Sequence, residues 1–325
     1  MENEKFNSIE EFASELAQRI RQAMYDQHGL VVEAESHLAN KTNDVDKQGI
    51  TVHFEGSSDM APTVYVEDAF DQFNDGIRTF EEIVNGMTSA IYDARLNQPE
   101  LPEFTADEAK KHITLTLVNT AMNQELLSKT PHFEILGGEL SAIPRWYLDE
   151  NASFVVHNDL CGSMGLTPDE VLKIGMDHIN SQHFEARPLQ DILAEMMGGD
   201  FMDMPPMDGP QMIVLSSENR IQGANALLSE DALNDVYEML GCQYVILPSS
   251  IHELLCLPLS EDVVPDELRS MVHEVNLTQV APEERLSDNV FFYDGIKLSV
   301  VRDGFGCEEQ ISAEPVVTRS AGMAI

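Results

Sequence analysis

The sequence predicts an α+β protein with largely antiparallel sheets and flanking helices, and three observations favour this class. Stretches such as 9–27 place apolar residues at the helical period directly after a capping signature. Other stretches alternate apolar and polar residues and are joined by short turns rich in Gly, Ser, Asn and Asp. The pair Asp294-Gly295 lies between two apolar runs, which predicts a hairpin with a type I′ turn.

Residues 1–100 are expected to form a module of one helix, a three-strand meander and a second helix. Ser8 and Glu11 fit a capping box for the first helix, and Gly29 is placed to end it. The polar composition of 40–48 predicts a turn-rich connector. The predicted elements are a helix at 9–27, strands at 30–35, 49–55 and 61–67, a helical turn at 68–73, a helix from 80 to about 92 and a linker at 97–102.

Residues 101–305 are expected to form a larger α+β domain. Thr105 and Thr167 carry cap signatures, Pro168 suits a first helical turn, and Ser229 separates two helices. The predicted strands are 112–118, 133–136, 141–147, 152–156, 211–215, 244–247 and 251–257. The predicted helices are 119–128, 168–179, 188–197, 224–228, 230–240 and 265–276.

Two stretches have an irregular composition. Residues 196–212 combine methionines with Gly-Gly, Pro-Pro and aspartates and contain no basic residue, which predicts a mobile loop. Its methionines suit a linker or, alternatively, an adaptable binding surface. Residues 306–325 show no clear period and are expected to form a flexible tail.

Acidic residues outnumber basic ones throughout the chain, with 57 Asp and Glu against 19 Lys and Arg and a formal net charge of -38. Lys110-Lys111 is the only adjacent basic pair, so the chain lacks the basic footprint that nucleic acids and anionic membranes require. We therefore expect neither direct nucleic-acid binding nor membrane binding. Solubility explains the acidity, and mimicry of nucleic acid is the sharper alternative.

Cysteine spacing and the amino terminus predict a cytoplasmic protein. Cys161, Cys242, Cys256 and Cys307 lie far apart without a C-x-x-C spacing, so neither a zinc knuckle nor a redox pair is indicated. The first residues are acidic rather than basic, and no run approaches 18 apolar residues. These features favour a reducing compartment.

The most distinctive run is 244–258, in which a buried-looking strand, a Pro-Ser-Ser break and a second apolar run follow one another. Its candidate functional or structural residues are Pro248, Ser249, Ser250, His252 and Glu253. On a strand, Ser250 and His252 would share a face about 6–7 Å apart, and Glu253 would point away. That separation is too long for a base to activate a nucleophile directly. The run is therefore interpreted as a corner between core strands, and a hydrolase would need His252 to pair with a distant carboxylate.

No cofactor and no metal are expected. His252 begins a sequence similar to the zinc motif H-E-x-x-H, but its fifth residue is Cys256. The pairs Gly137-Gly138 and Gly198-Gly199 lack the neighbouring residues that phosphate-binding loops require. A nucleotide enzyme is therefore not favoured.

Asn119 and Asn123 form a second candidate site, a polar corner directly after a predicted strand. At a helical spacing of four residues, their amides could bind a ligand or close the strand-helix corner. Capping is the favoured interpretation because asparagine commonly stabilises turns.

Three runs resemble a family of bacterial proteins known only as a domain of unknown function. They are 49–76, which contains Ala61-Pro-Thr-Val-Tyr-Val-Glu67, 117–123 leading to Thr130-Pro-His132, and Leu247-Pro-Ser-Ser-Ile-His-Glu253. The resemblance covers roughly residues 30–300. The part from 214 to 295 is also similar to a second uncharacterised bacterial family that shares the Pro-Ser-Ser-Ile-His-Glu run. The resemblance implies the fold and a cytoplasmic location, and it implies no activity.

Together these features predict an acidic cytoplasmic protein that acts through binding, with a protein partner favoured over a small molecule. Missing catalytic motifs and the acidic exterior support this prediction. The alternatives are a hydrolase that uses His252 and an acidic mimic of nucleic acid. The sequence does not indicate an oligomeric state.

Overall fold

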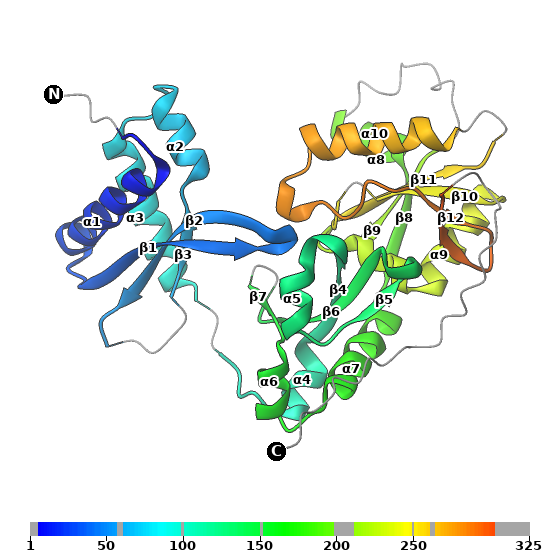
Figure 1. Ribbon diagram of the computed structural model, residues 1–325, viewed down its shortest axis with the longest axis horizontal. Helices are drawn as coiled ribbons and strands as arrows, with labels where there is room; N and C mark the ends of the chain where they lie inside the picture. The colour runs from blue at the N-terminus through cyan, green and yellow to red at the C-terminus, as the bar shows by residue number, and fades with distance from the viewer. Residues whose placement is uncertain are drawn as a thin grey trace. The chain divides into compact units, whose positions relative to one another are not determined.

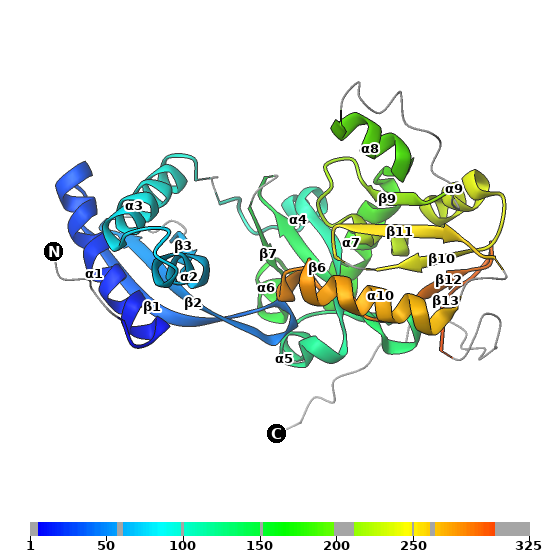
Figure 2. The same cartoon turned by 90° about the horizontal axis from the view of Figure 1, so that it is seen from above.

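The computed structural model describes residues 6–56, 61–98, 101–149, 152–197, 211–248, 250–260 and 264–302. The chain divides into two units, Met1–Pro102 and Glu103–Ile325, each with its own sheets and helices. Every strand pair among the described residues is antiparallel and helices flank the sheets, which confirms the predicted α+β class (Figures 1 and 2). The predicted tail at 306–325 lies outside the described residues, as does all of the predicted loop at 196–212 except its first two and last two residues.

In the first unit, helices pack on a three-stranded sheet of order β1-β2-β3 (Figure 1). The helices are α1 (Ile9–His28), α2 (Glu67–Asn74) and α3 (Phe80–Leu96), and the strands are β1 (Val32–Lys41), β2 (Val45–Phe54) and β3 (Thr63–Tyr65). The apolar stripe of α1 is buried against α3 and the sheet, as its helical period predicts. The fully buried side chains include Phe12, Leu16, Ile20, Ile83, Ile50 and Val52.

Helix α1 is closed at both ends by local hydrogen bonds. Ser8 Oγ accepts from Glu11 N at 3.3 Å, and Gly29 adopts a left-handed φ of 68° after the last turn. The carboxylate of Glu11 reaches back to Asn7 N at 2.9 Å, one residue earlier than the expected capping box requires.

The expected connector at 40–48 is mostly strand. β1 and β2 pair without interruption from Val32↔Phe54 to Lys41↔Val45, and the turn is confined to the short 3₁₀ segment η1 (Thr42–Asp44). The prediction failed because this half of the hairpin is polar, and most residues of 37–41 are exposed. Without a buried face, the strand period is absent from the sequence.

The second unit contains two sheets, and the first has the order β4-β6-β5 with β7 paired to β6. The strands are β4 (Ile113–Asn119), β5 (Phe133–Ile135), β6 (Leu140–Tyr147) and β7 (Ser153–Val155). Its helices are α4 (Ala106–His112), α5 (Gln124–Lys129), α6 (Asn158–Ser163) and α7 (Pro168–Ser181). α7 crosses β4 so closely that a Cβ on Gly175 would lie 2.6 Å from Leu115 Cδ2. The opposite face of this sheet carries an apolar cluster of Val118, Ile143 and Val155 with Leu126 and Leu127 of α5.

The other sheet of this unit has six strands in the order β13-β12-β10-β11-β9-β8. They are β8 (Phe184–Pro188), β9 (Ile213–Ser217), β10 (Tyr244–Leu247), β11 (Glu253–Pro258), β12 (Phe291–Tyr293) and β13 (Leu298–Val300). α8 (Leu189–Met197), α9 (Glu230–Leu240), α10 (Pro265–Thr278) and the 3₁₀ segment η5 (Gly223–Leu228) complete the unit. One face of this sheet packs into the main apolar core, to which α9 contributes Leu233 and Val236. Helix α10 lies on the other face (Figure 2).

In the second unit, the structure differs from the expectations in one turn type, one helix type and one strand start, and two short elements were not predicted. The Asp294-Gly295 hairpin has a two-residue loop of Gly295-Ile296, because Asp294 N donates to Lys297 O at 3.3 Å. Only Gly295, with φ 97°, has a positive φ in this turn, as in type II′ rather than type I′. The predicted helix at 224–228 is a 3₁₀ segment, and the predicted strand at 251–257 begins only at Glu253. Helix α6 and strand β8 have no counterpart among the predicted elements because they are short.

Within the part of the chain that the structure describes, no helix combines the length and the apolar composition needed to cross a membrane.

Candidate functional site

The Pro-Ser-Ser-Ile-His-Glu run forms the turn between β10 and β11. Pro248 follows the last residue of β10, and Ser249 lies outside the described residues. Ser250 Oγ accepts a hydrogen bond from His252 N at 3.1 Å, so this hydroxyl stabilises the turn. Glu253 is the first residue of β11, where it is exposed and paired with Ser216 of β9. His252 therefore lies in a bend before the strand rather than on it.

The imidazole of His252 has a partner at each ring nitrogen. Nδ1 accepts from Gln222 N at 3.4 Å, and Nε2 lies 3.4 Å from Glu284 Oε1. This pattern assigns the ring proton to Nε2, which donates to the carboxylate. Both side chains are partly exposed, with 34% of the His252 side chain and 42% of the Glu284 side chain accessible. A carboxylate from a distant part of the chain thus meets His252.

The backbone around His252 is held from three directions. Ser216 Oγ donates to His252 O at 2.7 Å, and Ile251 N donates to Glu284 O at 3.0 Å. A Cβ on Gly223 would lie 2.3 Å from His252 O and 2.2 Å from Ser216 Oγ. Only glycine fits this close approach of η5 to the turn.

A polar chain continues from His252 to the four-stranded sheet. Gln222, held at a φ of 55°, presents its side-chain oxygen Oε1 to Thr116 Oγ1 of β4, which donates to it. We call Glu284, His252, Gln222 and Thr116 the polar chain. It links the turn of one sheet to the middle of a strand in the other.

Asn225, three residues beyond Gln222, binds the free edge of β4. Its Oδ1 accepts from Leu117 N at 3.1 Å, and its Nδ2 donates to Leu115 O at 2.7 Å. Among the described strands, β4 lies at the edge of its sheet, so these backbone groups have no described strand partner on that side. The buried amide of Asn225 satisfies both of them.

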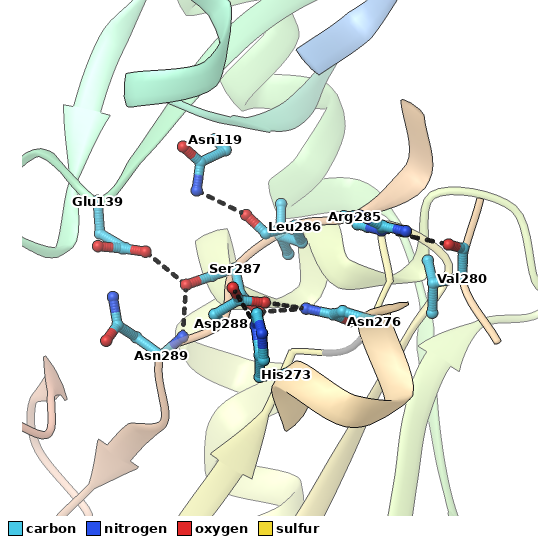
Figure 3. A network of polar contacts seen from close by, with 10 residues as sticks. All are labelled: Asn119, Glu139, His273, Asn276, Val280, Arg285, Leu286, Ser287, Asp288 and Asn289. Atoms are coloured by element: carbon cyan, nitrogen blue, oxygen red, sulfur yellow. Dashed lines mark hydrogen bonds and ion pairs between the residues drawn. The ribbon is translucent and has the colours of Figure 1, made fainter. Parts of the chain in front are cut away.

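A second polar network surrounds residues 285–289, between η6 (Pro282–Glu284) and β12 (Figure 3). Asn119 Nδ2 donates to Leu286 O at 3.0 Å, and Ser287 Oγ donates to a carboxylate oxygen of Glu139. Asn276 Nδ2 of α10 donates to Ser287 O at 3.0 Å. We call residues 282–289 the clasp, because together they bind the β10–β11 turn, the end of β4, residue 139 and α10.

Asp288 forms the outer end of the clasp. Its carboxylate accepts from Asn276 Nδ2 at 2.7 Å and lies 2.8 Å from His273 Nδ1. Burial raises the pKa of Asp288, but the hydrogen bonds from Asn276 and His273 together lower it by more than burial raises it. The pKa of Asp288 therefore lies below its ordinary value. The carboxylate is therefore ionised at neutral pH and anchors the clasp to α10.

The second candidate, the polar corner, closes the end of β4. Asn119 is the last residue of β4, and its Oδ1 accepts from Met122 N at 3.1 Å. Asn123 Nδ2 donates to Asn119 O at 2.8 Å, and both asparagines are buried. These bonds close the strand-helix corner, and Asn119 also holds the clasp.

The cysteines of the described part of the chain are free thiols at 161, 242 and 256. Burial raises the pKa of the Cys161 and Cys256 thiols, which keeps both protonated and unreactive at neutral pH. Among the described residues, no group of three or more His, Cys, Asp or Glu side chains is arranged to hold a metal ion.

Sequence reasoning identified His252, Asn119 and Asn123 but missed the partners of His252 and Asn119, which are Gln222, Glu284 and Leu286. These partners come from irregular segments, and only the tertiary fold brings them to the candidates. Sequence spacing carries no signal for contacts of this kind.

No curated protein and no solved structure matches the chain. One family matches it, described as a family of unknown function (DUF5688), and the match covers residues 9–295, which include parts of both units. The chain therefore belongs to the family of unknown function DUF5688.

Proposed function

We propose that the protein is a non-catalytic interaction module that binds a basic, amphipathic segment of another protein. The binding surface is the face of the six-stranded sheet on which α10 lies. The observation that carries this proposal is that the apolar residues of this face continue from a buried cluster to exposed positions on α10.

The buried part of this face lies under α10. Leu268 and Val272 of α10 pack with Val245 and Leu247 of β10 in one apolar cluster. Residues opposite each other in an antiparallel pair point to the same side of the sheet. The same face therefore continues through the half-buried residues Leu255, Leu257 and Val214.

The exposed part lies along one side of α10. Met271 is 50% exposed and Val275 is 40% exposed. They are four residues apart, so they adjoin each other on the helix surface beside the buried row of Leu268 and Val272. Exposed apolar side chains that extend a buried cluster are typical of a binding surface.

Helix α8 lies on this face as well. Arg187 of β8 pairs with Val214 in the sheet, and its guanidinium contacts Glu195 of α8. The neighbouring Met196 is 75% exposed. Its flexible thioether suits contact with a partner surface.

The charge around this surface selects the partner. Glu267 and Glu274 are exposed and lie within one turn of Met271 on α10. Together with the net charge of -38, they favour a segment that carries apolar side chains flanked by Lys or Arg. Nucleic acid is not proposed as a partner, and the free thiols support a cytoplasmic location.

Affinity capture with three versions of the full chain tests this proposal. We expect the wild type to retain proteins with basic amphipathic segments, and the double variant Met271→Glu, Val275→Glu to lose them. The control is Leu277→Glu, which introduces one carboxylate, where the double variant introduces two, at an exposed apolar position on another side of α10. Capture of nothing by the wild type, or an identical set from all three versions, would overturn the proposal.

The second candidate is a hydrolase, favoured by the contact between His252 Nε2 and Glu284 Oε1. A general base orients its ring through one nitrogen and keeps the lone pair of the other for the nucleophile. Here that lone pair, on Nδ1, accepts from Gln222 N, so the geometry supports catalysis less well than binding. Labelling of the wild type and of His252→Ala with reactive hydrolase probes tests this candidate. The hydrolase is rejected if the wild type is not labelled, or if both proteins are labelled equally.

A further inference from the structure

Arg145 of β6 is a half-buried cation without a carboxylate partner among the described residues. Its Nε donates to Ser153 Oγ of β7 at 2.8 Å, which leaves the two outer nitrogens of the guanidinium without a hydrogen bond to any described residue. Burial lowers the pKa of Arg145, the effect expected when no opposite charge compensates for lost hydration. Other described cations do have carboxylate partners: Lys110, Lys111, Lys129, Arg187 and Arg269.

Thr114 supplies a second unsatisfied group at the same place. It lies directly opposite Arg145 on β4, so both side chains leave the same face of the sheet. Its Oγ1 is buried and has no hydrogen-bond partner among the described residues. A buried hydroxyl without a partner costs about 1–3 kcal/mol, so a ligand that bonds to it recovers this free energy.

Tyr147 adds a further donor to this face. It lies two residues after Arg145 on β6, and Ser153 lies opposite it on β7. Burial raises the pKa of Tyr147, so its phenol stays protonated at neutral pH and can donate. The four side chains Arg145, Thr114, Tyr147 and Ser153 thus carry donors and no carboxylate.

The donor set defines the class of ligand. The two outer nitrogens of a guanidinium form a planar fork that matches two oxygens of one phosphate or carboxylate group. Threonine and tyrosine hydroxyls can donate to the remaining oxygens. In a chain with a net charge of -38, a half-buried cation without a countercharge is a specific place for an anion rather than part of a basic surface.

From this geometry we propose that Arg145, Thr114, Tyr147 and Ser153 form a binding site for a small oxyanion, a phosphate or carboxylate group. The site is independent of the proposed protein-binding surface, because it lies on the other sheet of the unit.

The site adjoins the polar chain. Thr114 and Thr116 are two residues apart on β4 and point to the same side, about 6–7 Å from each other. Thr116 connects through Gln222 to His252. An anion bound at Arg145 therefore lies near Thr116, the end of the polar chain that is farthest from the β10–β11 turn.

Titration of the full chain with inorganic phosphate and, separately, with acetate tests the site, with chloride at matched ionic strength as the reference. Thermal denaturation and calorimetry are the measurements. We expect saturable binding of phosphate, acetate or both beyond the effect of chloride, and the responding anion identifies the ligand group. No response beyond chloride would overturn the proposal.

Three variants locate the binding. Arg145→Gln should abolish it, and Thr114→Val, which keeps the shape of the side chain, should weaken it about tenfold, as expected for one hydrogen bond to a charged ligand. Lys129→Gln removes an exposed cation elsewhere in the unit and should bind like the wild type. If Arg145→Gln does not fold, Thr114→Val decides: unchanged affinity in that variant rejects the site.

Discussion

Removal of the Asn225 amide should destabilise the second unit strongly. Asn225 is 2% exposed, and its amide satisfies the N–H of Leu117 and the carbonyl of Leu115 on the free edge of β4. Asn225→Ala leaves both backbone groups buried without partners, at about 1–3 kcal/mol each. We expect a loss of about 2–6 kcal/mol from a folding free energy that is typically only about 5–15 kcal/mol.

Trp146 makes the measurement specific. It is the only tryptophan of the chain and is fully buried in the second unit, so its fluorescence in urea reports the unfolding of that unit. The matched control is Asn180→Ala, an exposed position of α7, for which we expect a change within about 0.5 kcal/mol. If Asn225→Ala costs less than about 1 kcal/mol, the amide does not hold the edge of β4 and the reasoning is wrong.

Asn225→Asp separates the two hydrogen bonds. The carboxylate keeps an acceptor for Leu117 N but loses the donor to Leu115 O. Burial raises the pKa of the new carboxyl, and its protonated form regains a donor. Stability should therefore be higher at low pH and fall as the pH rises through the pKa of the folded state. A variant whose stability, relative to the wild type, does not depend on pH would contradict this.

Three further predictions concern packing, charge and capping. Gly223→Ala should cost about 1–3 kcal/mol or more in urea denaturation because the added methyl overlaps the β10–β11 turn, whereas Gly162→Ala, where a Cβ meets open space in α6, should cost nothing. Asp288→Asn should lower the free energy of unfolding at pH 7 by less than about 1 kcal/mol, because 56% of the Asp288 side chain is exposed. Since the fold lowers the pKa of Asp288, this difference from the wild type should shrink as the pH falls below about 4, and a difference that stays constant would refute the assignment. Thr167→Ala removes the capping box of α7 and should cost about 1 kcal/mol in the same assay, and an unchanged midpoint would show that the cap is dispensable.

Elements with a buried stripe were predictable from the sequence. The helices α1 and α7 follow their caps and apolar periods almost to the residue, because local hydrogen bonds and one-sided burial leave a direct mark on the sequence. The polar half of the β1–β2 hairpin was not predictable, because its pairing depends on backbone hydrogen bonds that any side chain permits.

The candidate site was only partly predictable for a related reason. The run around His252 was recognised from the sequence, but the prediction that residues 251–257 form a strand placed the start of the strand too early. His252 N donates a hydrogen bond to Ser250 Oγ in a bend, and the strand begins only at Glu253. The carboxylate that meets His252 comes from the clasp, in a segment without a period. Contacts of this type follow from the packing of two sheets, which no local pattern encodes.

The position of the clasp in the chain has a consequence for biosynthesis. Residues 282–289 are made after the four-stranded sheet and most strands of the six-stranded sheet, yet they supply bonds to Asn119, Glu139 and Asn276. During synthesis, the hydrogen bonds of Asn119 at the end of β4 and of Asn276 on α10 to this segment cannot form until these late residues have emerged. In the first unit, by contrast, the last buried residue of the apolar core is Ile91. The second unit therefore reaches its final hydrogen bonding only near the end of synthesis, and a ribosome that stalls before residue 282 leaves the two sheets without one of the segments that join them.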